Sequence, residues 1–384
     1  MQSGIATKSA RIGEPSATAS VALSNRANSQ DRAADAEYRK NMTAESQKLQ
    51  KIPEWHDVDD EIFKNEIIAQ YRPAVLRGFV RKWPVVRHGL HSPEAVCRYL
   101  HGFDNGNHVD AIMTPPEVKG RIFYQGDMNG FNFMRNRLPV SAVLEQLLRY
   151  ARFPESPSVA VQSARIADCM PGFLNENKLT ALDPSILPRI WIGNKVTVPA
   201  HIDEAHNIAC SVSGRRRFTL FPPEQVSNLY IGPLDYAPTG APISMVSLNQ
   251  PDFQRYPKFR EALAAAQMTE LEPGDAIYIP TLWWHHVESL EKINILINYW
   301  WGGSIGSADQ PHSPFDALFH ALLNMRGLSP EIRSAWGAMF AHFAFDAAAN
   351  PTAHIPAHRH GVLGELPPEL AAQLRAWLAG KLQP

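Results

Sequence analysis

The sequence has few cysteines, no excess of charge of one sign and no long apolar run. Its three cysteines, Cys97, Cys169 and Cys210, form no Cys-x-x-Cys pair, so we expect neither a disulfide framework nor a zinc cluster. The 37 Lys and Arg residues against 38 Asp and Glu give a net charge of −1, which argues against nucleic acid as the main partner. No apolar run reaches the roughly 18 residues that span a bilayer, and no secretory signal is recognisable. These absences predict a reducing, cytoplasmic location.

Composition divides the 384 residues into three parts. Residues 1–50 are rich in Ala, Ser, Gln and Asn and contain one aromatic residue, Tyr38. A segment that can bury so little apolar surface cannot offset its ordering entropy, so we expect a disordered tail. Residues 51–303 carry strand patterns and the candidate site, and residues 304–384 show helical periodicity.

The motif Val-Pro-Ala-His-Ile-Asp-Glu at residues 198–204 is the first candidate for chemistry. Alternate side chains of a β-strand share a face, so His201 and Asp203 are expected to project together as a two-point chelate. A His-x-Asp pair alone is common by chance, and a third ligand has to come from elsewhere in the chain.

The second candidate is Trp-Trp-His-His-Val at residues 283–287, which follows a turn signal and the apolar run 275–280. Two imidazoles and one carboxylate make the facial triad typical of non-haem Fe(II) oxygenases. Neighbours in a strand point oppositely, so only one of His285 and His286 can join the triad. The spacing does not choose between them. Weaker alternative ligands are Glu288 and His206.

Strand patterns surround these motifs. Residues 207–212 and 216–221 flank a short turn at 213–215, which predicts a hairpin. Alternation places Arg216 on one face of the second strand together with Phe218 and Leu220. Near residue 300 another strand alternates, with isoleucines toward a core and Asn298 on the polar side, where it can line a cavity. The long Pro-rich segment 222–267 between these strands is expected to be functional.

Four segments, in this order, resemble the Jumonji C, or cupin-like, Fe(II)- and 2-oxoglutarate-dependent oxygenases, and among them the small asparaginyl-hydroxylase-like members. The similarity runs from about Ile67 to about Gly303. The segments are VPAHIDEAHNIACSVSGRRRFTLFPPEQVSNLY, QPDFQRYPKF, LEPGDAIYIPTLWWHHVESL and INILINYWW. The resemblance implies a mainly β, double-stranded β-helix (jelly-roll, cupin-like) barrel with N-terminal α/β elements and a C-terminal helical segment. It also implies a dioxygenase that uses Fe(II) and the co-substrate 2-oxoglutarate to hydroxylate a substrate, for which a protein side chain is one candidate.

The resemblance assigns roles to particular residues. It makes His285, the first histidine after the two tryptophans, the metal ligand beside His201 and Asp203. It matches Arg216 to a lysine that binds the far carboxylate of 2-oxoglutarate. The positions that it matches to the lining of the co-substrate or substrate pocket are Gln162, Asn207 and Asn298.

Three positions depart from the family pattern. Arg216 replaces the lysine, Ala160 replaces a tyrosine that contacts the co-substrate, and Val198 replaces a threonine. Arginine is not a neutral substitute for lysine, although its planar fork can bind a carboxylate at two points. The departures therefore keep open an alternative: a cupin-like metal or small-ligand binding protein without oxygenase turnover. Demethylase activity is a third reading, which the lack of a histone-reading module or zinc cluster disfavours.

The C-terminal part is predicted to form helices that begin after Ser313 and Ser329, each followed by proline. The apolar stripes at residues 315–323 and 332–343 are expected to be buried against another protein surface. In the resembling hydroxylases a C-terminal helix pair forms a homodimer, which we therefore expect here. Packing of the helices on their own domain is the alternative.

Overall fold

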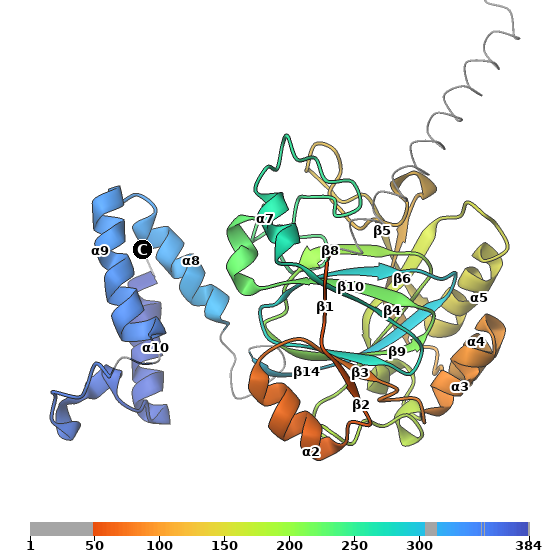
Figure 1. The fold of residues 1–384 in the computed structure, drawn as a ribbon, viewed down its shortest axis with the longest axis horizontal. Helices are drawn as coiled ribbons and strands as arrows, with labels where there is room; N and C mark the ends of the chain where they lie inside the picture. The colour runs from red at the N-terminus through yellow and green to blue at the C-terminus, as the bar shows by residue number, and fades with distance from the viewer. Residues whose placement is uncertain (1–48, 304–312, 347, 349, 383–384) are drawn as a thin grey trace, which may run out of the picture. The chain divides into compact units, whose positions relative to one another are not determined.

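A computed structural model describes residues 49–303, 313–346, 348 and 350–382 (Figure 1). The chain separates into two compact units, Met1–Pro311 and His312–Pro384. The predicted tail, residues 1–50, lies outside the described residues except for its last two positions.

Two β-sheets form the frame of the first unit. The five-stranded sheet has the spatial order β1 (Gln50–Lys51), β11 (Gln267–Leu271), β10 (Arg216–Phe221), β13 (Trp284–Ser289) and β8 (Thr197–His201). The nine-stranded sheet has the order β2 (Glu54–His56), β3 (Ala74–Arg77), β12 (Ala276–Ile279), β9 (Ala205–Ser213), β14 (Asn294–Gly303), β7 (Arg189–Gly193), β6 (Ser158–Arg165), β4 (His108–Thr114) and β5 (Met134–Pro139).

The chain passes repeatedly from one sheet to the other. β8 belongs to the five-stranded sheet, β9 to the nine-stranded sheet and β10 to the five-stranded sheet again, and β12, β13 and β14 alternate in the same way. This winding is that of a double-stranded β-helix, as predicted. The described strands hydrogen-bond as two sheets and not as one closed barrel.

The predicted hairpin around residues 213–215 is wrong. β9 pairs with β12 and β14, whereas β10 pairs with β11 and β13, so the turn crosses between the sheets. Gly214 makes the turn with φ of +72°, and a Cβ at this position would lie 2.5 Å from the carbonyl oxygen of Ile293. The close approach and the left-handed backbone together require glycine here.

Two apolar cores lie on the two faces of the nine-stranded sheet. The inter-sheet core joins side chains of both sheets, among them Phe218 and Leu220 of β10 and Leu296 of β14. The outer core contains the isoleucines of β14 and is covered by helices. The strand alternation predicted for β14 is therefore confirmed: one face packs outward, and the other faces the space between the sheets.

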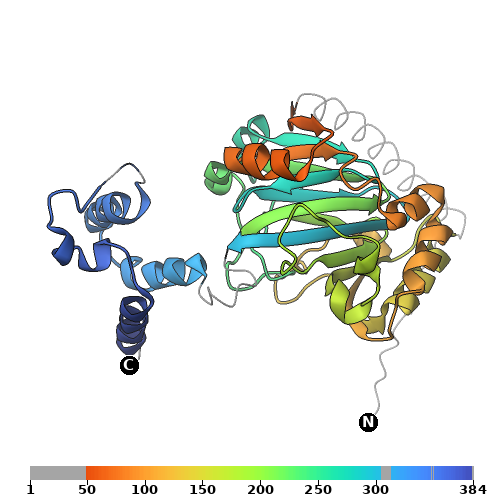
Figure 2. The same cartoon turned by 90° about the horizontal axis from the view of Figure 1, so that it is seen from below.

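Helices cover the outer core. In both views α3 and α4 lie side by side next to the sheets (Figures 1 and 2). The predicted helices at 61–71 and 138–152 are present, the first as consecutive α, π and 3-10 turns. The helical segments of this unit are α2 (Asp60–Ile62), η1 (Phe63–Ile67), η2 (Ile68–Gln70), α3 (Pro84–His91), α4 (Pro93–His101), η3 (Pro116–Val118), α5 (Val140–Tyr150), α6 (Ile166–Cys169), η4 (Phe173–Asn175), η5 (Pro223–Ser227) and α7 (Phe259–Ala264).

The second unit is helical. The side chains of Ser313 and Ser329 cap α8 and α9, and proline follows each serine as predicted. None of the described residues of α8, α9 and α10 is buried. Among the described helices of the whole chain, none has the length and apolar character needed to cross a membrane. The segments are α8 (Pro314–Met325), α9 (Pro330–Phe340), η6 (Ala341–Phe345), η7 (Ala357–Arg359), η8 (Gly361–Leu363) and α10 (Pro368–Leu382).

Candidate metal centre

Three predicted ligands lie together at one end of the sheets. His201 ends β8 and pairs across strands with His285 of β13, and their ring centroids are 4.1 Å apart. One donor atom from each of His201, Asp203 and His285 lies within 4.8 Å of the others. Within the part of the chain that the structure describes, no other three His, Cys, Asp or Glu side chains gather in this way. Asp203 lies just beyond β8, in the turn to β9. Strand alternation therefore grouped His201 with Asp203 correctly, although Asp203 is not itself in a strand.

Backbone carbonyls orient both imidazoles. Nδ1 of His201 donates to the carbonyl oxygen of Pro199 at 2.9 Å, and Nδ1 of His285 donates to that of Trp283 at 3.0 Å. A proton on Nδ1 leaves the Nε2 lone pair of a neutral ring available for a cation. Both histidines are therefore in the tautomer that a metal site requires.

The carboxylate of Asp203 is oriented by two donors. Its Oδ2 accepts hydrogen bonds from Nδ2 of Asn207 at 3.0 Å and from Nε1 of Trp300 at 2.9 Å. Asn298 in turn donates from Nδ2 to Oδ1 of Asn207 at 2.8 Å. Asn207 and Asn298 thus help to fix the orientation of the Asp203 carboxylate. Trp300 was not among the predicted site residues, although alternation puts it on the same strand face as Asn298.

Burial keeps His201 uncharged. Burial, followed by the neighbouring His285, lowers the pKa of His201 to about 4. A neutral ring at pH 7 suits metal binding because protons do not compete for Nε2.

His286 points away from the triad. It alternates with His285 and pairs across strands with Thr219, and its Nε2 has no hydrogen-bond partner among the described residues. The two weaker alternatives are engaged elsewhere. His206 contacts the Tyr278 hydroxyl through Nδ1 at 3.0 Å, and Glu288 accepts from Asn249 and Arg217. Of the histidines in the second motif, the geometry brings His285 to the triad.

Arg216 is a buried cation without a counter-charge. Only 8% of its surface is exposed, and its guanidinium makes no hydrogen bond or ion pair with any described residue. Burial lowers its pKa to about 10. The adjacent arginines differ, because Arg215 pairs with Glu291 and Arg217 with Glu270. A buried unpaired charge is costly, so an anion between the sheets is the natural partner of Arg216.

Trp191 is a second unpaired donor on the inter-sheet side. It packs against the inter-sheet core, and its buried Nε1 has no partner among the described residues. Ala160 of β6 pairs with Gly193 of β7, two residues from Trp191, and supplies no polar side chain. Gln162, two residues further along β6, is half-buried. Trp191 was not among the predicted site residues, because a tryptophan in a strand normally indicates core packing.

Two segments cover the outer edge of β8. In the Pro-rich segment, Ile243 forms a β-bridge with His201, and the N–H of Ser244 donates to Ala200 at 2.8 Å. At the other end of β8, the N–H of Ile122 donates to Thr197 at 3.0 Å. Part of the Pro-rich segment therefore lies beside a candidate ligand.

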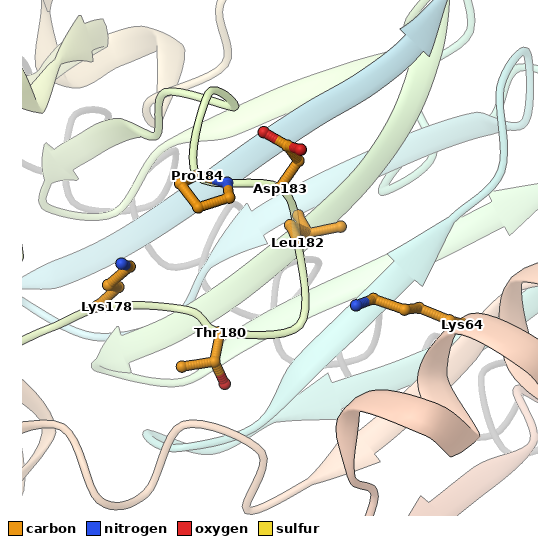
Figure 3. Close-up of a pocket in the computed structure, with 6 residues that line it drawn as sticks. All are labelled: Lys64, Lys178, Thr180, Leu182, Asp183 and Pro184. Atoms are coloured by element: carbon orange, nitrogen blue, oxygen red, sulfur yellow. The ribbon is translucent and has the colours of Figure 1, made fainter.

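A surface pocket of about 450 Å³ lies apart from these residues, between η1 and residues 178–184 (Figure 3). Lys64 and Lys178 line it together with Thr180 and Asp183, and none of the predicted site residues contributes. With one carboxylate and two lysines, it lacks the donor set of a metal site.

Comparisons with known proteins agree with this geometry. A family model described as "Cupin-like domain" matches residues 59–307. The Jumonji C domain-containing protein 5 of Drosophila melanogaster is 34% identical over 259 residues, covering 65% of this chain and 59% of that protein. Lysine-specific demethylase 8 of Xenopus tropicalis is 23% identical over 257 residues, 65% of this chain and 52% of that protein. HSPB1-associated protein 1 of Bos taurus is 36% identical over 113 residues, 29% of this chain and 23% of that protein. The matches thus span from 23% to 59% of the length of these relatives.

Proposed function

Because the chain belongs to the cupin-like (Jumonji C) domain family, we propose that it is an Fe(II)- and 2-oxoglutarate-dependent dioxygenase of the hydroxylase type. The predicted family and cupin-like fold class are confirmed by the family match over residues 59–307. The observation that carries the proposal is Arg216: a buried guanidinium without a counter-ion faces the same inter-sheet space as three converging metal donors. A dicarboxylate co-substrate needs both features, a metal at one end and a cation at the other.

Each site residue then has a task. His201, Asp203 and His285 would hold Fe(II), and Oδ2 of Asp203 lies 3.5 Å from Nε2 of His285. Arg216 would bind the far carboxylate of 2-oxoglutarate. Trp191 would donate its unpaired N–H to the same molecule, in place of the tyrosine hydroxyl that Ala160 lacks. The donor set is that of a facial triad, with three positions left for exogenous ligands.

Fe(II), 2-oxoglutarate and dioxygen together supply the oxidation of a substrate C–H bond to an alcohol, with release of succinate and carbon dioxide. The chain's own residues supply position and exclusion of water. Trp283, Val287 and Phe218 line the inter-sheet core beside the triad, so the co-substrate would sit in an apolar space where the charge of Arg216 acts strongly.

The test is conversion of 2-oxoglutarate to succinate by the Fe(II)-loaded protein without added substrate. We expect slow, metal-dependent succinate formation that His201→Ala removes. The second candidate, a metal or small-ligand binding protein without turnover, is favoured by Ala160 and Val198, which lack the donors of the family pattern. Tight binding of metal and 2-oxoglutarate with no succinate formed would select it and reject the hydroxylase.

The substrate class is a further part of this proposal. Two relatives are lysine-specific demethylases by name, which makes a protein side chain the first class to test. Hydroxylation of a C–H bond is also the chemical step that a hydroxylase and a demethylase of this kind have in common. The cytoplasmic location and the lack of a nucleic-acid partner stay predictions.

We also propose a homodimer formed through the C-terminal helices. Leu323 of α8 and Trp336 and Met339 of α9 are exposed, and an apolar face of this kind is typical of the centre of a subunit interface. Trp336→Glu and Phe340→Glu should each halve the mass measured by light scattering, because a buried charge opposes association. Ser334→Glu adds the same charge to the same helix at a polar position and should leave the dimer intact. A wild-type monomer at micromolar concentration would end this proposal.

A further inference from the structure

Two arginines lie side by side at the end of the nine-stranded sheet where β9 begins, just after the candidate ligand Asp203. β6 ends at Arg165 and β7 begins at Arg189, and these two residues pair in register. On its other side Arg189 pairs with Asn298 of β14. Asn298 is linked through Asn207 to the carboxylate of Asp203. The arginine pair therefore lies directly beside Asn298, which belongs to the hydrogen-bonded support of the candidate metal centre.

Both arginines belong to the inter-sheet face. Along β7, Ile190 and Ile192 point into the outer core, whereas Trp191 packs against the inter-sheet core. Alternation puts Arg189 on the same face as Trp191. Residues paired in register share a face, so Arg165 belongs to that face as well. The pair thus lies on the rim of the space in which the metal donors converge.

The fold does not neutralise this pair. Neither arginine has a carboxylate oxygen of a described residue within 4 Å, and Nη1 of Arg189 donates only to Ser163, to its carbonyl oxygen at 3.0 Å and to its hydroxyl at 3.4 Å. Burial, followed by the charge of Arg165, lowers the pKa of Arg189, and the opposing effect of Asp168 is smaller. Like charges directly opposite each other in a sheet are destabilising. An anion bound between them would remove that cost.

Local backbone geometry holds Arg189 in place. Ser163, with φ of +50°, lies in an irregularity of β6 between Val161 and Ala164. Its carbonyl oxygen is thereby directed to the guanidinium of Arg189. A non-glycine residue in the left-handed region is uncommon and costs free energy, so this backbone conformation is a specific feature of the rim.

We propose that Arg165 and Arg189 bind an anionic side chain of a peptide substrate, a carboxylate or a phosphoryl group, next to the residue presented to the metal. That this peptide is a substrate rests on the proposed function, whereas the binding of an acidic peptide does not. Arginine suits this task because its planar fork binds such groups at two points. Substrate choice would then depend on an acidic residue near the modified position.

The test uses the full chain loaded with redox-inactive Zn(II) and three fluorescein-labelled Gly-Ser peptides. These carry a central run of glutamate, of phosphoserine or of glutamine, and their affinities are measured by fluorescence anisotropy at low salt. The glutamate or phosphoserine peptide should bind at least about tenfold more tightly than the glutamine peptide, which corresponds to about 1.4 kcal/mol. The comparison of the two anionic peptides identifies the preferred group.

Variants locate the binding site. Arg189→Gln and Arg165→Gln should each remove most of the preference for the anionic peptide, and Arg189→Lys should restore part of it. Arg165 is exposed, so its substitution leaves the buried structure intact. Arg98→Gln, on α4 over the outer core, is the matched control and should change nothing.

Three results would overturn the inference: equal binding of the glutamine peptide by the wild-type protein, unchanged preference in both arginine variants, or an equal loss in Arg98→Gln. Succinate formation by the Fe(II)-loaded wild-type protein is measured separately. Its absence would reject the proposed dioxygenase and leave the peptide result standing. Binding of 2-oxoglutarate by Arg189→Gln, measured by calorimetry, should equal that of the wild type.

Discussion

Replacing Asp203 with alanine should abolish tight Fe(II) binding. Asp203 is the one anionic member of the candidate triad, and its Oδ2 is already held by Asn207 and Trp300. Changing groups that only support a ligand usually costs about 10- to 100-fold in metal affinity. Loss of the ligand itself should cost more than about 100-fold. Anaerobic titration and metal analysis of the purified protein would measure this, with one Fe(II) per chain expected for the wild type.

A pair of histidine variants provides the control for this prediction. His285→Ala should lose the metal, and His286→Ala should keep it, because the two side chains leave β13 on opposite faces. Both side chains are nearly buried, 3% and 4% exposed, so the comparison is matched for burial. The reverse outcome would show that the ligand assignment is wrong.

Arg216→Ala should weaken binding of 2-oxoglutarate by at least about 30-fold. Removing one partner of a buried charge pair costs on the order of 2 to 5 kcal/mol, and about 1.4 kcal/mol corresponds to a factor of ten. Arg216→Lys should recover only part of the loss, because an ammonium group cannot reproduce the two parallel hydrogen bonds of the guanidinium. Calorimetry on the Zn(II)-loaded protein measures this binding without turnover.

The neighbouring arginines are matched controls. Arg215→Ala and Arg217→Ala remove the same charge one position away, but these side chains already pair with Glu291 and Glu270. Both variants should bind 2-oxoglutarate nearly as the wild type does. An equal loss in all three would indicate a diffuse basic surface, and no loss in Arg216→Ala would remove the main support for this co-substrate.

Periodicity predicted local geometry well and sheet membership poorly. Alternation placed Arg216 with Phe218 and Leu220, and the structure buries all three. The same pattern suggested a hairpin at Gly214, where the chain in fact crosses between sheets. A short turn with glycine serves either purpose, and the choice depends on the partners that each strand finds far away in sequence.

The parts of the site that sequence reasoning missed depend on strand register. Trp300 and Asp203 are far apart in the chain and meet only because β14 lies beside β9. Arg165 and Arg189 become neighbours through the pairing of β6 with β7. Trp191 could have been selected only by knowing that its N–H would remain unpaired. No pattern within a single strand carries that information.

β8, which ends at His201, is also the outermost strand of its sheet. An uncovered strand edge is a template for pairing with another chain, and here residues 120–122 and 243–244 occupy most of that edge. These two segments therefore protect the protein from self-association through the strand that carries a candidate ligand. If heat or proteolysis detached the Pro-rich segment, the same event would loosen His201 and expose the unpaired, aggregation-prone edge of β8. Loss of metal and precipitation should then occur together, so that inactivated protein would be recovered as aggregate and not as soluble, refoldable chain.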